Sequence, residues 1–195
     1  NWANHIRVYE WNDPNWNQLG SDIEASDDIF FGHSVSLNSD GLIVAIGAWY
    51  AEDDNGDRSG HVQVYEWNGT SWNQLGSDID GEAIDDYSGW CVSLSSYGTR
   101  VAIGAPWNDG NVSNSGHVRV YEWNDISWNQ LGLDIDGEDE NYWSGYSVSL
   151  NSDGTIVAIG AMWADGDNGD NSGHVRIYQW NGTSWNQLGS DIDGE

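Results

Sequence analysis

One short sequence pattern recurs four times along the chain and constrains its fold more than any other feature. Each copy begins at a histidine, continues as a run such as His-Val-Arg-Val-Tyr-Glu-Trp, and ends shortly afterwards in Trp-Asn-Gln-Leu-Gly. The histidines are His5, His61, His117 and His174, which are 56, 56 and 57 residues apart. Such a period is typical of propellers and linear arrays, in which each small sheet stacks on its neighbours to bury its faces. This architecture disfavours a single buried catalytic site.

Each full repeat contains four strand-like runs. In the third repeat, Tyr146 to Leu150 alternates apolar and polar residues, an Asp-Gly turn follows, and 155–161 is continuously apolar. Residues 174–180 and 185–189 complete the set. Alternation predicts a strand, Asp-Gly between such runs predicts a hairpin, and the apolar run is expected of a strand covered on both faces. We therefore predict an all-β fold of β-propeller type, built from four-stranded antiparallel blades.

The runs divide the chain into one half-blade and three full blades. Residues 1–28 supply only the last two runs, whereas residues 29–84, 85–140 and 141–195 each supply four. We therefore expect 14 strands, or about 3.5 blades, in a single array. Closed propellers usually have about four to eight blades, and neither end supplies the missing first two runs. The array is expected to stay open or to belong to a larger one, with edges that another copy can pair with.

The charge of the chain excludes several classes of partner. There are 32 acidic residues against 5 basic ones, and the net charge is −27. Nucleic acid requires a cationic surface, and docking on anionic lipid is disfavoured for the same reason. No apolar run is long enough for membrane insertion. Copies of such a chain repel one another unless cations screen them, so salt or divalent cations are expected companions.

Three segments of the first full repeat resemble the FG-GAP repeat, the blade unit of integrin α-subunit propellers and of many large secreted surface proteins. They are Phe-Gly-His-Ser-Val-Ser-Leu at 31–37, Ile-Val-Ala-Ile-Gly-Ala at 43–48 and Gly-His-Val-Gln-Val-Tyr at 60–65. The similarity extends over essentially the whole chain, although the later repeats have Ser-Gly in place of Phe31-Gly32. The resemblance implies a β-propeller, an extracellular location, a role in adhesion or scaffolding, and often bound calcium.

Calcium is expected in different loops from those of the family. In FG-GAP blades the calcium loop typically joins the first two strands, but here that connection is a turn such as 151–154, too short for six to eight oxygen ligands. Acidic loops instead follow the second strand, and their Asp and Asn oxygens suit Ca²⁺, although no later bidentate glutamate follows. A solvated turn is the alternative. The candidate ligands are Asp165, Asp167 and Asp170 in one loop and Asp53, Asp54 and Asp57 in another.

Aromatic residues gather just before the first strand of each repeat and just after the second. Flat rings beside carboxylates and amides form a platform for a sugar ring, which makes a lectin the alternative function. Burial between blades or subunits is the competing interpretation, because Trp and Tyr are also enriched there. The candidate sugar-binding residues are Tyr87, Trp90, Trp143 and Tyr146 in the first group and Trp49, Trp107 and Trp163 in the second.

The remaining signals favour a protein that is not an enzyme. Asn68, Asn111 and Asn181 begin glycosylation sequons in predicted turns, although turn chemistry alone explains Asn-Gly. No nucleophile–base constellation stands out, and a hydrolase on a propeller scaffold is the least favoured reading. We predict a non-catalytic extracellular structural or adhesion module. Its expected partners are copies of itself or flanking repeats of the same chain, with glycans as the alternative.

Overall fold

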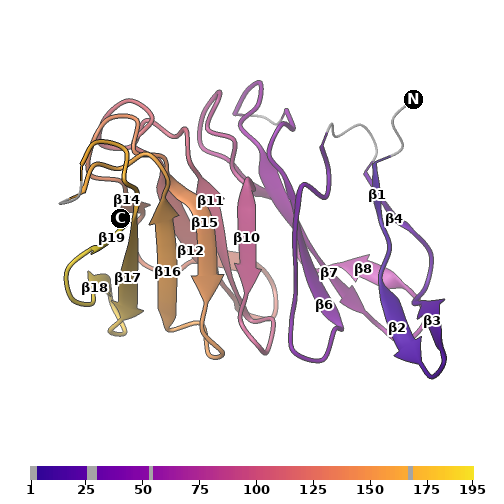
Figure 1. Cartoon of the computed structure of the whole chain (residues 1–195). Helices are drawn as coiled ribbons and strands as arrows, with labels where there is room; N and C mark the ends of the chain where they lie inside the picture. The colour runs from indigo at the N-terminus through magenta and orange to yellow at the C-terminus, as the bar shows by residue number, and fades with distance from the viewer. Residues whose placement is uncertain (1–3, 26–29, 53–54, 167–168) are drawn as a thin grey trace.

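The computed structural model describes residues 4–25, 30–52, 55–166 and 169–195, and every regular element in these ranges is a β-strand. Figure 1 shows the sheets standing side by side in a row, with the two termini at opposite ends. The described ranges contain no helix that is long and apolar enough to cross a membrane. The all-β blade architecture expected from the repeat is confirmed.

The strands form a half-blade followed by three full blades. The half-blade contains β1 (His5–Ile6), β2 (Tyr9–Asn12), β3 (Asn15–Gln18) and β4 (Ile23–Glu24). The first blade contains β5 (Ser34–Leu37), β6 (Ile43–Ala48), β7 (His61–Trp67), β8 (Trp72–Gln74) and β9 (Ile79–Asp80). The second contains β10 (Cys91–Leu94), β11 (Arg100–Ala105), β12 (His117–Trp123), β13 (Trp128–Gln130) and β14 (Ile135–Asp136). The third contains β15 (Ser144–Leu150), β16 (Ile156–Ala161), β17 (His174–Trp180), β18 (Trp185–Gln187) and β19 (Ile192–Asp193).

The strands within each blade follow one another as antiparallel neighbours, but the expected count of 14 strands is wrong. The structure has 19 strands in the described ranges, because β1 and β2 are separate and each last run splits in two. In the second blade Tyr121 pairs with Gln130 and Val118 pairs with Ile135. Residues 131–134 therefore lie opposite only residues 119–120 of the partner strand. Gly132 at φ +84° lies in the resulting bulge, which interrupts the strand just before its acidic end.

The hydrophobic core lies between consecutive blades. Val62 and Val64 of β7 pack with Val101 and Ile103 of β11, and all four are buried. The second and third blades repeat the arrangement with equivalent residues. Both faces of an inner sheet are thus covered, which is why β6 and β11 read as continuous apolar runs.

Close backbone contact between blades explains the glycine of the Ala-Ile-Gly-Ala run. A Cβ on Gly47 would lie 2.1 Å from the carbonyl oxygen of Gly89 in the next blade. A Cβ on Gly104 would lie equally close to the carbonyl oxygen of Gly145. No side chain larger than hydrogen fits at these positions unless the blades separate.

Serine hydroxyls connect the first strands of neighbouring blades. Ser34 and Ser36 of β5 accept hydrogen bonds of 2.9 Å from the backbone N–H groups of Val92 and Leu94 in β10. Ser93 accepts the N–H of Leu150 in the same way. These bonds satisfy amides on the free edge of each blade, which accounts for the alternating serines.

Candidate functional site

The aromatic residues singled out in the loops form one continuous cluster across the three blades, which we term the aromatic belt. Its members are Phe30, Trp49, Tyr50, Tyr87, Trp90, Trp107, Trp143, Tyr146 and Trp163. The structure brings all seven candidate sugar-binding residues into this belt. They lie on the edge of the array where the second strands end and the third strands begin.

Edge-to-face and tilted contacts hold most of the rings of the aromatic belt together. The ring centroids of Trp49 and Trp90 are 5.2 Å apart, and those of Trp90 and Trp107 are 4.7 Å apart. Trp107 contacts Trp143 at 4.8 Å. The Trp49–Trp90 and Trp107–Trp143 contacts join neighbouring blades, and the Trp90–Trp107 contact lies within one blade. Aromatic pairs favour such geometries.

Three strained turns aim rings into the belt. Phe30, Tyr87 and Trp143 occupy equivalent positions and have φ values of 65°, 55° and 54°. This left-handed conformation is uncommon for bulky residues and carries a cost. In each turn the carbonyl of this residue accepts a hydrogen bond from the N–H three positions later, which belongs to His33, Trp90 or Tyr146. Recurrence of the strain in every blade indicates that the turn geometry is required for blade contact.

The burial of the belt favours packing over ligand binding for most of its rings. Only Phe30 and Trp163, at its two ends, are exposed, whereas the others are half-buried. The ring faces in the middle are in contact with other rings. The belt therefore joins the blades along its length and presents open rings only at its ends.

Several described residues of the acidic loops accept hydrogen bonds from backbone N–H groups. Asp165 accepts a hydrogen bond of 2.8 Å from the N–H of Asn171, and Asp109 accepts the same bond from Asn114 in the second blade. The carbonyl of Asp57 accepts the N–H of Asp85, and Asp170 is exposed. The candidate calcium ligands Asp53, Asp54 and Asp167 lie outside the described residues. The described part brings no set of these predicted ligands together around one point.

Two of the three sequon asparagines shape their own turns. The Oδ1 atom of Asn68 accepts hydrogen bonds from the N–H groups of Thr70 and Ser71 at 2.9 Å. Asn181 does the same with Thr183 and Ser184. The Nδ2 group of Asn111 instead donates to the carbonyl of Gly137 at 3.3 Å. These bonds account for asparagine at each position without a glycan.

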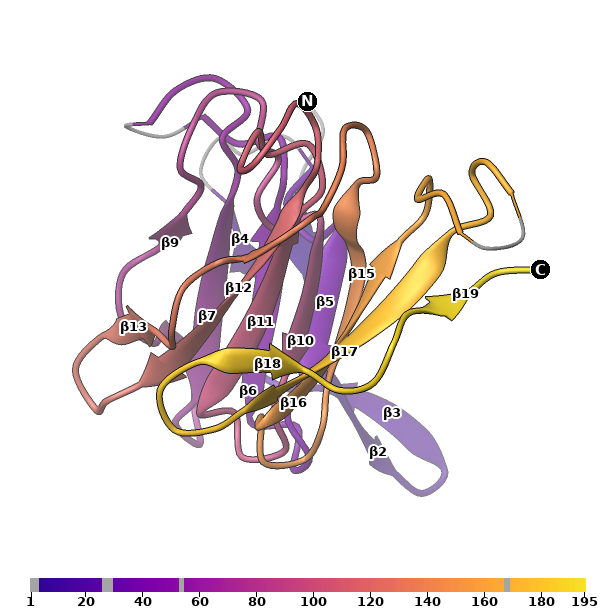
Figure 2. The ribbon, with the colours of Figure 1, turned by 90° about the vertical axis from the view of Figure 1, so that its left-hand side faces the viewer.

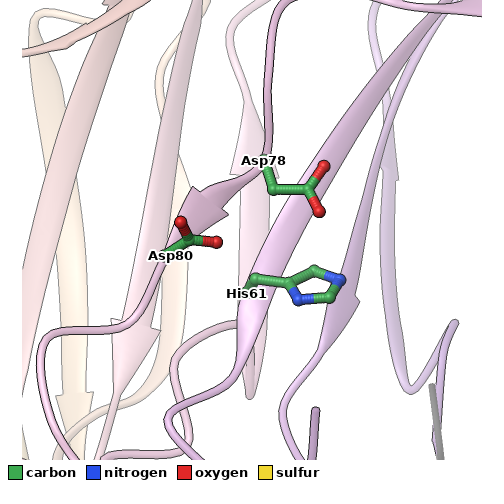
Figure 3. A group of neighbouring side chains, drawn as sticks. All are labelled: His61, Asp78 and Asp80. Atoms are coloured by element: carbon green, nitrogen blue, oxygen red, sulfur yellow. The ribbon is translucent and has the colours of Figure 1, made fainter. Parts of the chain in front are cut away.

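A histidine and nearby carboxylates recur in every blade, which the sequence did not predict. Figure 3 shows His61 at the start of β7 with Asp78 and Asp80 beside it. The corresponding groups are His117 and Asp134 of the second blade with Glu82 of the first, and His174, Asp191 and Asp193 of the third blade. The four histidines belong to different blades, as expected, but each has its own acidic partners. The bulge in the last run of each blade brings the aspartates beside the histidine. The regular spacing between each histidine and the following Asp-Ile-Asp segment is the sequence signal that could have predicted these groups.

Two polar links bridge consecutive repeats. The first is an ion pair between the glutamate that follows the last strand and an arginine of the next blade: Glu82 with Arg119 at 3.4 Å, and Glu138 with Arg176. In the second, the indole Nε1 of Trp128 donates to the carbonyl of Leu75 at 2.8 Å. Trp72 and Trp185 bond to Leu19 and Leu131 in the same way.

Both ends of the array leave surfaces that inner blades bury. Figure 2 shows β17, β18 and β19 at the C-terminal end with no further sheet over them. Ile192 there is 57% exposed, whereas the equivalent Ile135 is 5% exposed. A groove of ≈ 540 Å³ lies on this face, lined by Gly160, Val175 and Ile192 among others. At the other end, Trp16 is 65% exposed and its equivalents are half-buried.

Comparison with known families and structures agrees with this architecture. The FG-GAP repeat model matches residues 19–65 and 78–121. No curated protein sequence matched the chain.

Solved structures share the fold, and two of them illustrate the likeness. A putative 6-phosphogluconolactonase from Bacteroides uniformis aligns with 99% of this chain and 50% of its own, with a TM-score of 0.66 and 10% identity. Kuenenia stuttgartiensis hydrazine synthase aligns with 87% of this chain and 39% of its own, with a TM-score of 0.51 and 8% identity. This chain thus spans half of the first structure's length and less of the second. At such identities the likeness concerns the fold alone.

Proposed function

We propose that this chain, an FG-GAP-like repeat protein with repeats matched at 19–65 and 78–121, is a non-catalytic structural module. In this proposal it acts in adhesion outside the cell and assembles head to tail with copies of itself. The observation that carries the proposal is the pair of uncovered blade surfaces at the two ends of the array. A blade of this kind buries its faces only against a neighbour. An uncovered face is therefore suited to binding another repeat.

The apolar parts of the two ends match the contacts found inside the chain. Leu131 of the second blade packs in the same cluster as Tyr178 and Trp185 of the third. At the open ends the corresponding residues are Leu188 on one side and Tyr9 and Trp16 on the other, and all three are exposed. Joining one copy to the next would bury them as the inner seams do, and apolar burial is favourable at about 25 cal/mol per Å².

The polar links are also left incomplete in a complementary way. Arg7 is bonded to Asp22 of its own half-blade, and its equivalents Arg119 and Arg176 also meet a glutamate of the preceding blade. Glu195 holds the position of that glutamate at the other end of the array. Trp16 and the carbonyl of Leu188 likewise match a bonded pair of the inner seams. The proposed seam joins Glu195 to Arg7 and Leu188 to Trp16.

A further repeat of a longer chain is the second source of a covering blade. Val175 and Ile192 face the position that the second strand of a following blade would occupy, because their equivalents pack on Val157 and Ile159 in the inner seam. The half-blade of another copy has no such strand. Light scattering distinguishes the two sources: the chain alone associates if copies dock, and the same chain extended by one full repeat stays a monomer if a flanking repeat is the natural occupant.

The charge of the chain sets the condition for assembly. At a net charge of −27, copies repel one another at low ionic strength. Salt or divalent cations would weaken this repulsion, since screening lengths fall to about 10 Å at 0.1 M. Calcium in the acidic loops around Asp165 and Asp170 would act in the same direction. Calorimetric titration with Ca²⁺ tests that contribution, and absence of both heat and a shift in unfolding temperature would remove calcium from the proposal.

Size-exclusion chromatography with light scattering tests the assembly. We expect mass to rise with protein concentration at about 0.15 M salt, and Leu188→Asp to abolish the rise by placing a charge in the seam. Ile126→Asp is the matched control, because Ile126 is exposed on a turn away from both ends. A wild-type chain that stays monomeric at every salt and protein concentration would overturn the proposal.

An extracellular location is supported by the family and by the acidic surface. Antibody labelling of intact source cells, compared with permeabilised cells, measures it directly. We expect labelling without permeabilisation, and labelling that requires permeabilisation would contradict this part of the proposal.

Glycan binding is the second candidate function, and the exposed rings at the ends of the aromatic belt favour it. Trp163 and Phe30 present open faces, which suit the C–H face of a sugar. A glycan array with the wild-type chain, Trp163→Ala and Trp90→Ala tests this function. Loss of binding in Trp163→Ala would support it, and an array without bound glycans would remove it.

A further inference from the structure

His117 begins β12 beneath the seam between the first and second blades, and its side chain is 1% exposed. Its Nδ1 atom lies 3.9 Å from Oδ2 of Asp134, in the same blade, and 4.0 Å from Oε2 of Glu82, in the preceding blade. Neither ring nitrogen has a hydrogen-bond partner among the described residues. A buried polar group without a partner is costly and uncommon, so the orientation of this ring toward two carboxylates requires an explanation.

The surroundings of Glu82 carry excess negative charge. Asp86, Asp134 and Asp136 all act on Glu82 electrostatically, and the guanidinium of Arg119 opposes them. Four carboxylates against one guanidinium leave three negative charges when all are ionised. Arg119 holds Oε1 of Glu82 at 3.4 Å, which directs Oε2 toward the histidine. A second cation is therefore favoured at the point that the three side chains face.

We propose that Glu82, His117 and Asp134 bind one divalent transition-metal ion, with Zn²⁺ as the type, across the seam between the first and second blades. One imidazole nitrogen and two carboxylate oxygens are a typical donor set for such an ion, and water would complete its coordination because Glu82 is partly exposed. The three ligand atoms lie within 4.8 Å of one another. Ligand atoms of a tetrahedral zinc site are about 3.4 Å apart, so small rotations of the Glu82 and Asp134 side chains toward His117 would close the site. The ion would join two blades.

The corresponding histidine–carboxylate groups in the first and third blades explain why the metal ion is proposed at the seam between the first and second blades. In the third blade Glu138 pairs with Arg176, while His174 lies 3.8 Å from Asp191. Glu138 still acts on His174 electrostatically, but the carboxylates grouped around this histidine, Asp191 and Asp193, both belong to its own blade. In the first blade the position of Glu82 is held by Ser26. His61, Asp78 and Asp80 (Figure 3) thus form a group confined to one blade.

Zinc binding to the full chain tests the proposal. After dialysis against EDTA, calorimetric titration with ZnCl₂ is expected to show a tight site. Glu82→Gln, Asp134→Asn and His117→Gln should each weaken this site by at least about tenfold. Glu138→Gln is the matched control, because it removes the equivalent glutamate from a seam without the third ligand, and it should leave the affinity within about twofold. Calcium at the same concentration should not displace zinc, since the nitrogen ligand disfavours it.

A zinc-edge anomalous map of soaked crystals provides the second measurement and does not depend on variant stability. The expected peak lies between the three side chains. Binding that survives all three substitutions, or a map with no peak at this position, would overturn the proposal. Neither outcome bears on assembly, which light scattering measures separately.

Discussion

The indole of Trp72 donates a hydrogen bond of 2.8 Å to the backbone carbonyl of Leu19, which precedes it by 53 residues. The same bond joins Trp128 to Leu75 and Trp185 to Leu131. Trp16 occupies the same position in the half-blade and is 65% exposed. Each of the three bonded tryptophans thus connects two repeats of the chain, whereas Trp16 is available to join one copy to another.

Substitution of equivalent tryptophans is expected to separate stability from assembly. Trp72→Phe removes an inner hydrogen bond and should lower the free energy of unfolding by about 1–2 kcal/mol. Trp16→Phe should leave that free energy within about 0.5 kcal/mol, because the side chain is exposed, and should weaken association. Urea denaturation and light scattering measure the two effects. Equal destabilisation by both variants would contradict the assignment.

Alanine substitution of two equivalent glycines should lower the free energy of unfolding only where the next blade covers the glycine. Gly104→Ala places a Cβ 2.1 Å from the carbonyl oxygen of Gly145, so the blades must move apart, at about 1–3 kcal/mol. Gly160→Ala meets only the hydroxyl of Ser147 from its own blade, which can rotate away. Urea denaturation of the two variants is the measurement. A destabilising Gly160→Ala with a neutral Gly104→Ala would reverse the expectation.

Cys91 should be unreactive in the folded chain. Its Sγ lies 3.0 Å from the carbonyl of Gly145, and burial raises the pKa of the thiol to about 12. Because the thiolate is the reactive form, thiol-specific reagents should label the folded protein slowly at pH 8 and the urea-unfolded protein rapidly. Rapid labelling of the folded chain would show that the seam opens.

The raised pKa of Cys91 also predicts a pH dependence of stability. The folded state keeps the thiol proton while the unfolded state releases it near pH 9, so the unfolded state binds fewer protons between about pH 9 and 12. Stability from this group is complete below pH 9 and falls as pH rises through that window. Cys91→Ser should show a shallower decline in the free energy of unfolding over the same range. Identical slopes would contradict the prediction.

Rings inside the aromatic belt should matter more to stability than rings at its ends. Trp107 contacts Tyr87, Trp90 and Trp143, so Trp107→Ala should lower the free energy of unfolding by about 3 kcal/mol. Trp163→Ala should lower it by less than about 1 kcal/mol, because that ring is exposed. Thermal and urea unfolding measure both. Similar losses would mean that the belt is not the packing element described.

The period of the histidines, the hairpin turns and the apolar second strands were enough to predict the blades and their order. The local chemistry was harder to predict because the last run, from Trp128 to Asp136, reads as one strand. The bulge at Gly132 shifts the register by two residues and brings Asp134 toward His117. A residue pattern does not show such a shift. The link between Glu82 and Arg119 did leave a signal: where the glutamate is Ser26, the arginine of the next blade is Gln63.

Charge reversal at the two ends tests the proposed assembly most directly. Light scattering would compare Arg7→Glu, Glu195→Arg and the double variant at about 0.15 M salt. Each single variant is expected to weaken association, and the double variant is expected to restore it, because the two exchanged charges would again attract each other across the seam between copies. Association that is unchanged in both single variants, or a double variant weaker than either, would contradict the proposed assembly.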